Sequence, residues 1–400
     1  MALLSRSPAF ASLLSARALS LVGDGVCNLA LIVYVQETNG TGIAIGLLLL
    51  VASLPALLSP VTGVFSDRVD QRRLLAACEI AQCFLVVVIF VWLPPLAPLL
   101  VLLFLKATAA TIADPAARSA VPALVADTDL VAANAMLSGL RQIGDVLGPL
   151  LGGVLVATVD VRGALGVDAV SFVVGAVLLL RLPALRPALL DERENTGVLR
   201  ASWAGLRYVG SHPVARAAAI AFFLIGLSAA DDVALPFLAR DLGAGDVGIG
   251  AIYAAGAAGM IVGFALLLRV TRVFSPARGF VAGAAIMGLG NGLTGIAPAL
   301  ALAIGFQLVR GLGTALVDTN LQTLLQRSVE RPMLGRVFAN VYGAVGIAAA
   351  VSVTLGGVLL DATSPGTVLV VAGLLAIAAS IVAAMLLRAN QSAASRTMEL

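Results

Sequence analysis

The chain has 400 residues, of which 60% are hydrophobic and only 12% are charged, and its mean hydropathy is +1.04. Soluble globular domains are about half apolar and about a quarter charged, so this composition excludes a water-soluble protein and predicts an integral membrane protein. The net charge of +3 and the pI of about 9.0 would suggest a nucleic-acid partner in a soluble protein. In a membrane protein we expect no nucleic acid, because the positions of the arginines explain the charge.

Apolar segments of about 20 residues, long enough to cross a bilayer as a helix, recur along the whole chain. We predict twelve spanning helices, at residues 11–36, 43–66, 74–94, 98–118, 131–157, 164–182, 213–238, 246–269, 278–297, 299–326, 336–360 and 366–388. The start could pass for a signal peptide, since Arg6 precedes an apolar stretch. Because Asp24 interrupts that stretch and eleven spans follow, we interpret it as an uncleaved first helix.

Arginines concentrate in alternate loops and in the tails. The loop after the second span is one example, whereas only Arg162 and Arg240 fall in the loops on the opposite side. Cytoplasmic loops carry an excess of arginine and lysine, so the pattern places both termini in the cytoplasm. We therefore expect a multi-pass protein of the plasma membrane, the inner membrane if the source is bacterial.

The chain repeats itself at a fixed offset. Lys106 and Asp114 recur 204 residues later as Arg310 and Asp318, in register with several glycines. We infer two pseudo-symmetric six-helix halves, residues 1–182 and 213–388, joined by a cytoplasmic linker (183–212) and followed by a cytoplasmic tail (389–400). Within the linker, Val198–Val209 has apolar residues at helical spacing and predicts an amphipathic helix on the cytoplasmic surface.

A short polar loop between the second and third spans carries the most specific motif. Its glycine and its charged positions are Gly63, Asp67, Arg68, Arg72 and Arg73. The pattern resembles the cytoplasmic loop G-x-x-x-D-R-x-G-R-R of the major facilitator superfamily. Asp70 and Gln71 depart from it, at the positions of the second glycine and of one arginine.

The resemblance implies a cytoplasmic gate. In relatives, the loop acid caps the start of the eleventh helix, which here corresponds to Asp67 at Gly335–Arg336, and a loop arginine meets an acid at the end of the fourth. Because Gln71 replaces the usual arginine, we expect Arg72 to bind Asp114. We expect this latch to be closed when the outer side is open.

The fifth predicted span carries a pattern of small residues and one proline: Gly144, Gly148, Pro149, Gly152 and Gly153. Small residues at this spacing allow two helices to approach closely, and the proline bends the span. The run resembles the fifth-helix signature of drug-exporting antiporters in the superfamily, with Ala135 in place of its first glycine. The eighth span offers a matching face at Gly256, Gly259 and Gly263. Ordinary small-residue contacts remain the alternative.

Charged side chains inside spans cost about 2.5–3.5 kcal/mol each, so they persist where they pair or line water. The candidate proton-coupling and cavity residues are Arg17, Asp24, Lys106, Arg141, Asp145, Asp231, Asp232 and Arg310. Asp24 is the preferred coupling site, because no neutralising group is adjacent and Arg17 lies two turns earlier. Arg141 and Asp145 are four residues apart and can form a structural pair.

Other intramembrane charges have simpler interpretations. Glu79 and Asp168 lie within about two turns of an interface and are expected to reach it. At most one of Asp231 and Asp232 can face a cavity easily, since they point about 100° apart. Lys106 and Arg310 lie at equivalent depths and should repel each other unless an acid (Asp24 or Asp145) or an anionic substrate lies between them.

The resemblance covers the whole chain and extends to the branch of enterobactin exporters and macrolide efflux pumps. It rests on Phe10, Ser20–Asp24, Asp67–Arg73, Ala133–Ala135 and Gly335–Arg336. It implies a monomeric, proton-coupled exporter of a hydrophobic or amphipathic small molecule, of the drug or siderophore class, working by alternating access among membrane lipids. Uptake or lipid flipping on the same fold is the first alternative.

A membrane enzyme or sensor without transport is the second alternative. The sequence has no metal-ligand spacing, no serine–histidine pair and no accessory domain that would support catalysis. A nucleotide-binding G-x-x-x-x-G-K-[ST] loop is also absent, so that motif cannot supply ATP hydrolysis. We therefore expect no enzymatic activity, no cofactor and no metal, with energy supplied by an ion gradient.

Overall fold

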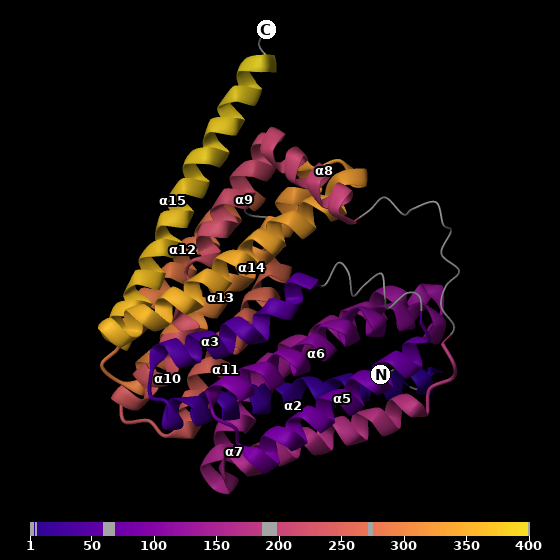
Figure 1. Ribbon diagram of the computed structural model, residues 1–400. Coiled ribbons are helices and arrows are strands. Elements are labelled where there is room, and N and C mark those ends of the chain that lie inside the picture. Colours follow the sequence, from indigo (N-terminus) through magenta and orange to yellow (C-terminus); the bar gives the residue numbers. More distant parts are fainter. Residues whose placement is uncertain (1–3, 5, 59–68, 186–197, 271–274, 399–400) are drawn as a thin grey trace. The chain divides into compact units, whose positions relative to one another are not determined.

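The computed structural model describes residues 4, 6–58, 69–185, 198–270 and 275–398 (Figure 1). Within these residues every regular element is a helix. Nine helical segments of the described chain are long and apolar enough to cross a membrane, compared with twelve predicted spans. The predicted all-α membrane fold is confirmed.

Three of the first four predicted spans correspond to described helices, whereas residues 59–66 of the second predicted span, 43–66, lie outside the described residues. Helix α2 covers Pro8–Thr38, and α3 covers Gly42–Ser53 and continues as the 3₁₀ helix η1, Leu54–Leu58. Helix α5 covers Gln71–Trp92 and α6 covers Leu96–Leu124. Asp70 caps α5, because its carboxylate accepts hydrogen bonds from the backbone N–H groups of Arg72 and Arg73 at 3.0 and 3.4 Å.

Helix α7, Leu130–Leu180, contains both the fifth and the sixth predicted spans. Asp160 interrupts it with non-helical backbone angles (φ 69°, ψ 171°). This residue lies between the predicted spans 131–157 and 164–182, where the sequence indicated a break. The two parts are called the first and second halves of α7 below.

The seventh predicted span, 213–238, is not one helix. Helix α9, Pro213–Gly226, ends at a turn, and α10, Asp231–Asp241, begins after it. Before them, α8 covers Val198–Ser211, at the predicted amphipathic segment. Trp203 and Leu206 on α8 are exposed, as expected of a helix that lies on a membrane surface.

The remaining helices complete the chain. Helix α11 covers Asp246–Val270, α12 covers Pro276–Gly295 and α13 covers Leu300–Ser328. Helix α14 covers Arg331–Ala362 and α15 covers Pro365–Met398. The eleventh helix therefore begins at Arg331, earlier than the predicted start at 336, so Gly335 and Arg336 lie inside it.

The helices form two compact units. The first unit holds Met1–Gly40, Leu47–Arg193 and Ala244–Ala254, and the second holds Thr41–Gly46, Glu194–Gly243 and Ala255–Leu400. Two short segments thus pack with the other half of the sequence, unlike the predicted halves. Close glycine contacts explain this exchange, since Gly42 packs on Gly357 in the second unit and Gly250 packs on Gly153 in the first.

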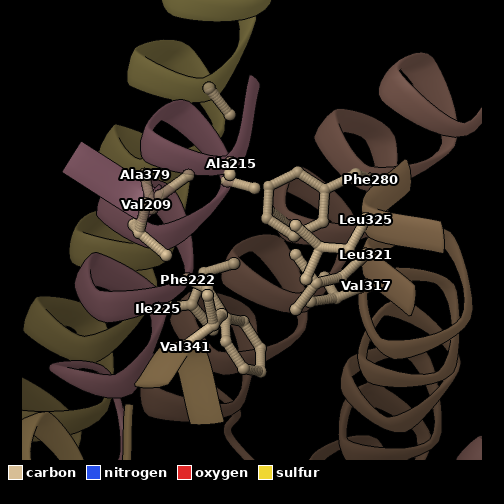
Figure 2. Packing of buried hydrophobic residues seen from close by; sticks show 14 of the residues in the cluster. Val209, Ala215, Phe222, Ile225, Phe280, Val317, Leu321, Leu325, Val341 and Ala379 are labelled. Carbon is tan, nitrogen blue, oxygen red and sulfur yellow. The ribbon is translucent and has the colours of Figure 1, made fainter. Parts of the chain in front are cut away.

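Each unit has its own apolar core. In the first unit, Phe10 and Leu13 of α2 pack with Leu75 of α5. In the second, Phe222 and Ile225 of α9 pack with residues of other helices, as Figure 2 shows. Large apolar side chains such as Phe84 on α5, which is 66% exposed, lie on outer faces, where a bilayer would cover them.

Candidate functional site

Polar side chains of α2 point into the first unit. Arg17, Ser20 and Asp24 are three and four residues apart, so they share one helix face. Arg17 is 6% exposed and Ser20 is 1% exposed. This face brings charged groups of α5, α6 and both halves of α7 together, and the group is called the first charge cluster.

Arg17 binds two acids in this cluster. Its Nη2 contacts Oδ1 of Asp114 on α6, and its Nη1 lies 3.9 Å from Oε1 of Glu79 on α5. Asp114 also binds Nη1 of Arg141, on the first half of α7, at 2.8 Å. The Ser20 hydroxyl donates a hydrogen bond of 2.7 Å to Oε2 of Glu79.

Lys106 on α6 is the second cation of the cluster. Its Nζ lies 2.5 Å from Oδ1 of Asp24 and 3.6 Å from Oδ2 of Asp168, on the second half of α7. It also lies 5.5 Å from the centre of the Phe172 ring, within the range of a cation–π contact. Burial strengthens these attractions, because the side chain of Lys106 is only 4% exposed.

These contacts correct three expectations. Asp24 has a neutralising partner, Lys106, which lies one helix away rather than adjacent in sequence. The ion pair of Arg141 is with Asp114 on α6 and not with Asp145, one turn later on its own helix. Both Glu79 and Asp168 are fully buried between helices and do not reach an interface.

The cytoplasmic gate also differs from expectation. Asp114 is occupied by Arg17 and Arg141, while Arg72 donates a hydrogen bond of 2.6 Å to the carbonyl of Leu180. The predicted Arg72–Asp114 contact is therefore absent in this conformation. Arg73 is exposed, and Arg336 Nη1 lies 3.8 Å from the sulfur of Met333. The other predicted gate residues lie outside the described residues: Gly63, Asp67 and Arg68.

The second unit has a charge cluster of its own, centred on Arg310 of α13. Its Nη2 lies 2.6 Å from Oδ2 of Asp231 and 3.8 Å from Oδ1 of Asp232. Asp231 is fully buried and also accepts a hydrogen bond of 3.0 Å from Asn291 on α12. Gln307 on α13 donates to the Asn291 side chain and extends the network.

Lys106 and Arg310 therefore each bind acids of their own unit. The sequence left open whether an acid or a substrate anion would neutralise them. Asp24, one of the two acids considered, neutralises Lys106, whereas Asp231 neutralises Arg310. These acids neutralise both cations, so no anionic substrate is needed to compensate their positive charges.

The glycines of the fifth span pack mainly on α2. A Cβ atom built on Gly25 would lie 2.7 Å from Cα of Gly148, so neither position has room for a side chain. Gly144 and Gly152 approach Leu21 and Val26 of α2 in the same way. Gly153 faces the start of α11 instead.

The prediction that glycines of the eighth span pack on those of the fifth named the wrong residues of the eighth span. Gly256, Gly259 and Gly263 of α11 face α13, and Gly250 makes the contact with Gly153. Gly250 is the repeat partner of Gly46, but nothing in the sequence showed which face of the helix would turn toward which neighbour.

Two hollows adjoin the first charge cluster. A small cavity of about 30 Å³ is lined by Arg17, Asp114, Arg118 and Arg141, and it has room for one or two water molecules. A wider apolar groove of about 450 Å³ runs between α2 and α7, with Val22, Leu147 and Val167 in its wall. Among the described residues no three metal-ligating side chains gather.

Comparisons with known proteins agree with the fold. A family model described as Major Facilitator Superfamily matches residues 13–231 and 232–398. The chain is 29% identical over 342 residues to the enterobactin exporter EntS of Citrobacter koseri, covering 84% of this chain and 82% of that protein. It is 27% identical over 365 residues to the MFS-type transporter YfiS of Bacillus subtilis, covering 88% and 86%.

Solved structures show the same fold. The nucleoside transporter NupG aligns with a TM-score of 0.80 at 12% identity, covering 94% of this chain and 99% of that one. A bacterial homologue of the iron transporter ferroportin, in an inward-facing state, aligns with a TM-score of 0.72 at 16% identity, covering 95% and 98%. At such identities the likeness concerns the fold alone.

Proposed function

This chain belongs to the major facilitator superfamily and is a multi-pass membrane transporter, and we propose that it exports a siderophore or another amphipathic small molecule by proton-coupled alternating access. The observation that carries the proposal is the similarity to an enterobactin exporter over 84% of the chain. Family membership indicates a transporter rather than an enzyme.

The charge clusters support coupling to protons. Buried ion pairs in spans are costly to keep, and they mark ion pathways and proton relays in membrane proteins. Asp24, half-way along α2 and 21% exposed, is bound to the almost fully buried Lys106. A proton that neutralises Asp24 would free Lys106, so Asp24→Asn should abolish gradient-driven export while leaving membrane insertion intact.

The apolar groove beside α2 supports an amphipathic substrate. It places an apolar wall next to a cluster that contains both signs of charge. A molecule with an apolar body and polar or anionic groups fits that combination. The interpretation of α8 as a helix at the membrane surface, and the cytoplasmic gate of Asp67, Arg72 and Asp114, remain part of this proposal.

The test is transport direction in vesicles that contain the purified protein. Inside-out vesicles whose interior is more acidic than the medium should accumulate a catecholate siderophore such as enterobactin. A protonophore should stop the accumulation. Empty vesicles serve as the control. Accumulation in right-side-out vesicles alone would favour uptake, and movement of labelled phospholipid without siderophore transport would favour lipid flipping.

A further inference from the structure

Glu79 is a buried acid that its surroundings do not fully neutralise. Its side chain is 0% exposed, and its Oε1 accepts no hydrogen bond from any described residue. The nearest cation, Arg17, lies 3.9 Å away, and the Ser20 hydroxyl binds the other oxygen. The Gly175 backbone closes the site, since a Cβ there would lie 2.8 Å from Oε2.

Asp168 repeats this arrangement one helix away. Its side chain is also 0% exposed, and its Oδ2 accepts no hydrogen bond within the described chain. Lys106 lies 3.6 Å from that oxygen. Ser171, one turn later, places its hydroxyl 3.5 Å from Oδ1.

Each cation is held more closely by a competing acid. Arg17 contacts Asp114, whose side chain is 38% exposed, and Lys106 contacts Asp24, whose side chain is 21% exposed. The buried acids therefore have the longer contacts and the exposed acids the shorter ones. Water can solvate the more exposed carboxylates, whereas a buried carboxylate depends on a nearby cation. The cations therefore lie farther from the acids whose charge is more costly to leave unpaired.

The cluster has more acids than cations. The cations that face it are Arg17 of α2, Lys106 of α6 and Arg141 of α7. The acids are Asp24 of α2, Glu79 of α5, Asp114 of α6 and Asp168 of α7. Three cations against four carboxylates leave one negative charge uncompensated. Arg118 and Asp145 border the cluster and add one charge of each sign, so this difference does not change. A buried unpaired charge costs several kcal/mol, and binding one proton removes that cost.

We propose that Glu79 and Asp168 form a proton-binding site behind α2, occupied while Arg17 and Lys106 bind Asp114 and Asp24. This rests on the proton coupling proposed above, and it adds Glu79 and Asp168 to Asp24 as groups that bind a proton. When Arg17 moves from Asp114 to Glu79, the O–H bond of the Glu79 carboxyl breaks. The proton passes to water in the cavity beside Arg17, and the new carboxylate pairs with the guanidinium.

The site can be tested directly by infrared spectroscopy of the full-length protein in lipid. At neutral pH the wild type should show the C=O stretch of a protonated buried carboxyl. Glu79→Gln and Asp168→Asn should each weaken that band, and the double variant should lack it. Asp127→Asn, which alters an exposed acid of the same unit, should leave the band unchanged. No such band in the wild type, or an undiminished band in the double variant, overturns the proposal.

Two further variants test the competition for Arg17 even if Glu79→Gln folds poorly. Asp114→Asn leaves Arg17 free to pair with Glu79, so the band should weaken. Arg17→Gln removes the cation, so Glu79 should keep its proton and the band should persist. Equal bands in both variants would show that Arg17 is not shared and would overturn the proposal.

Transport separates this proposal from the proposed function. If wild type and the double variant Glu79→Gln/Asp168→Asn export equally well with a proton gradient, the proton site is wrong and the function stands. If the band is present in the wild type and absent from the double variant, but the wild type never exports, the proposed function is wrong and the proton site stands.

Discussion

The first helix of one unit and the seventh of the other occupy the same place in the repeat but differ in continuity. Helix α2 runs unbroken through Gly25, which packs on Gly148. At the position 204 residues after Gly148, α14 has Ser352. Its hydroxyl donates to the carbonyl of Leu227 at 2.6 Å and accepts from the N–H of Ala230 at 3.0 Å, in the break between α9 and α10.

One packing position of the repeat therefore lies against two different backbone conformations. Inside a membrane, a backbone group that leaves the helical pattern must find another partner. Against an intact helix, a glycine at this position is enough, because its only role is to leave room for the backbone of the neighbouring helix. Serine provides the hydrogen bonds that a broken helix lacks.

The break also changes the charges. In the first unit the acid of the first helix, Asp24, lies mid-helix, and Lys106 is shared with a second, fully buried acid. In the second unit Asp231 begins α10, where the helix dipole favours a negative charge, and the buried acid has the short contact to Arg310. The second cluster thus compensates its buried acid, whereas the first does not.

The largest effect is expected for Lys106→Met. It removes the cation and leaves Asp24 and Asp168 unpaired, and breaking a buried pair in this way costs about 3–5 kcal/mol. The midpoint of thermal unfolding in detergent should fall accordingly. Adding Asp24→Asn and Asp168→Asn should restore most of the loss. A triple variant as unstable as Lys106→Met would show that Lys106 acts through its packing on Phe172.

In the second unit, Asp231→Asn and Asp232→Asn should differ. Asp231 is fully buried and has the short contact to Arg310, so its replacement should cost about 3 kcal/mol. Asp232 is 42% exposed and lies 3.8 Å from Arg310, so its replacement should cost about 1 kcal/mol or less. Thermal unfolding of both variants measures the difference in stability. Equal losses of stability would contradict the stronger pairing of Asp231 with Arg310.

Ser352→Ala tests the broken helix. The change leaves the Leu227 carbonyl and the Ala230 N–H without their partner, and an unsatisfied buried polar group costs about 1–3 kcal/mol. Amide hydrogen exchange at Ala230 should also become faster. Slow exchange in the variant would mean that the turn is held by its own backbone hydrogen bonds.

Gly148→Ala tests the unbroken counterpart, with Gly139→Ala as its matched control on α7. The added methyl would lie 2.5 Å from Cα of Gly25, so overpacking should cost about 1–3 kcal/mol. Gly139 has no atom within 4 Å of the built Cβ, so its replacement should stabilise the helix by about 0.5–1 kcal/mol. Similar unfolding temperatures for both variants would argue against tight packing at Gly148.

Much of the fold could be predicted because hydropathy is a local property. A span such as 299–326 is visible in any window of its own residues, and α13 covers Leu300–Ser328. The break near Asp160 was predicted in the same way, from the polar residues around it. The break between α9 and α10 was missed, since the chain there, from Gly226 to Ala230, has no charged residue or proline.

The sequence by itself determined the class of protein and the family, because these follow from composition, periodicity and short motifs. It also identified most of the charged residues of both clusters. Only the tertiary structure decided their partners: Lys106 with Asp24, Arg141 with Asp114, and Glu79 and Asp168 hidden from any interface. The reason is geometric, since a partner on another helix depends on that helix's rotation and depth, which side-chain packing sets and no single segment encodes.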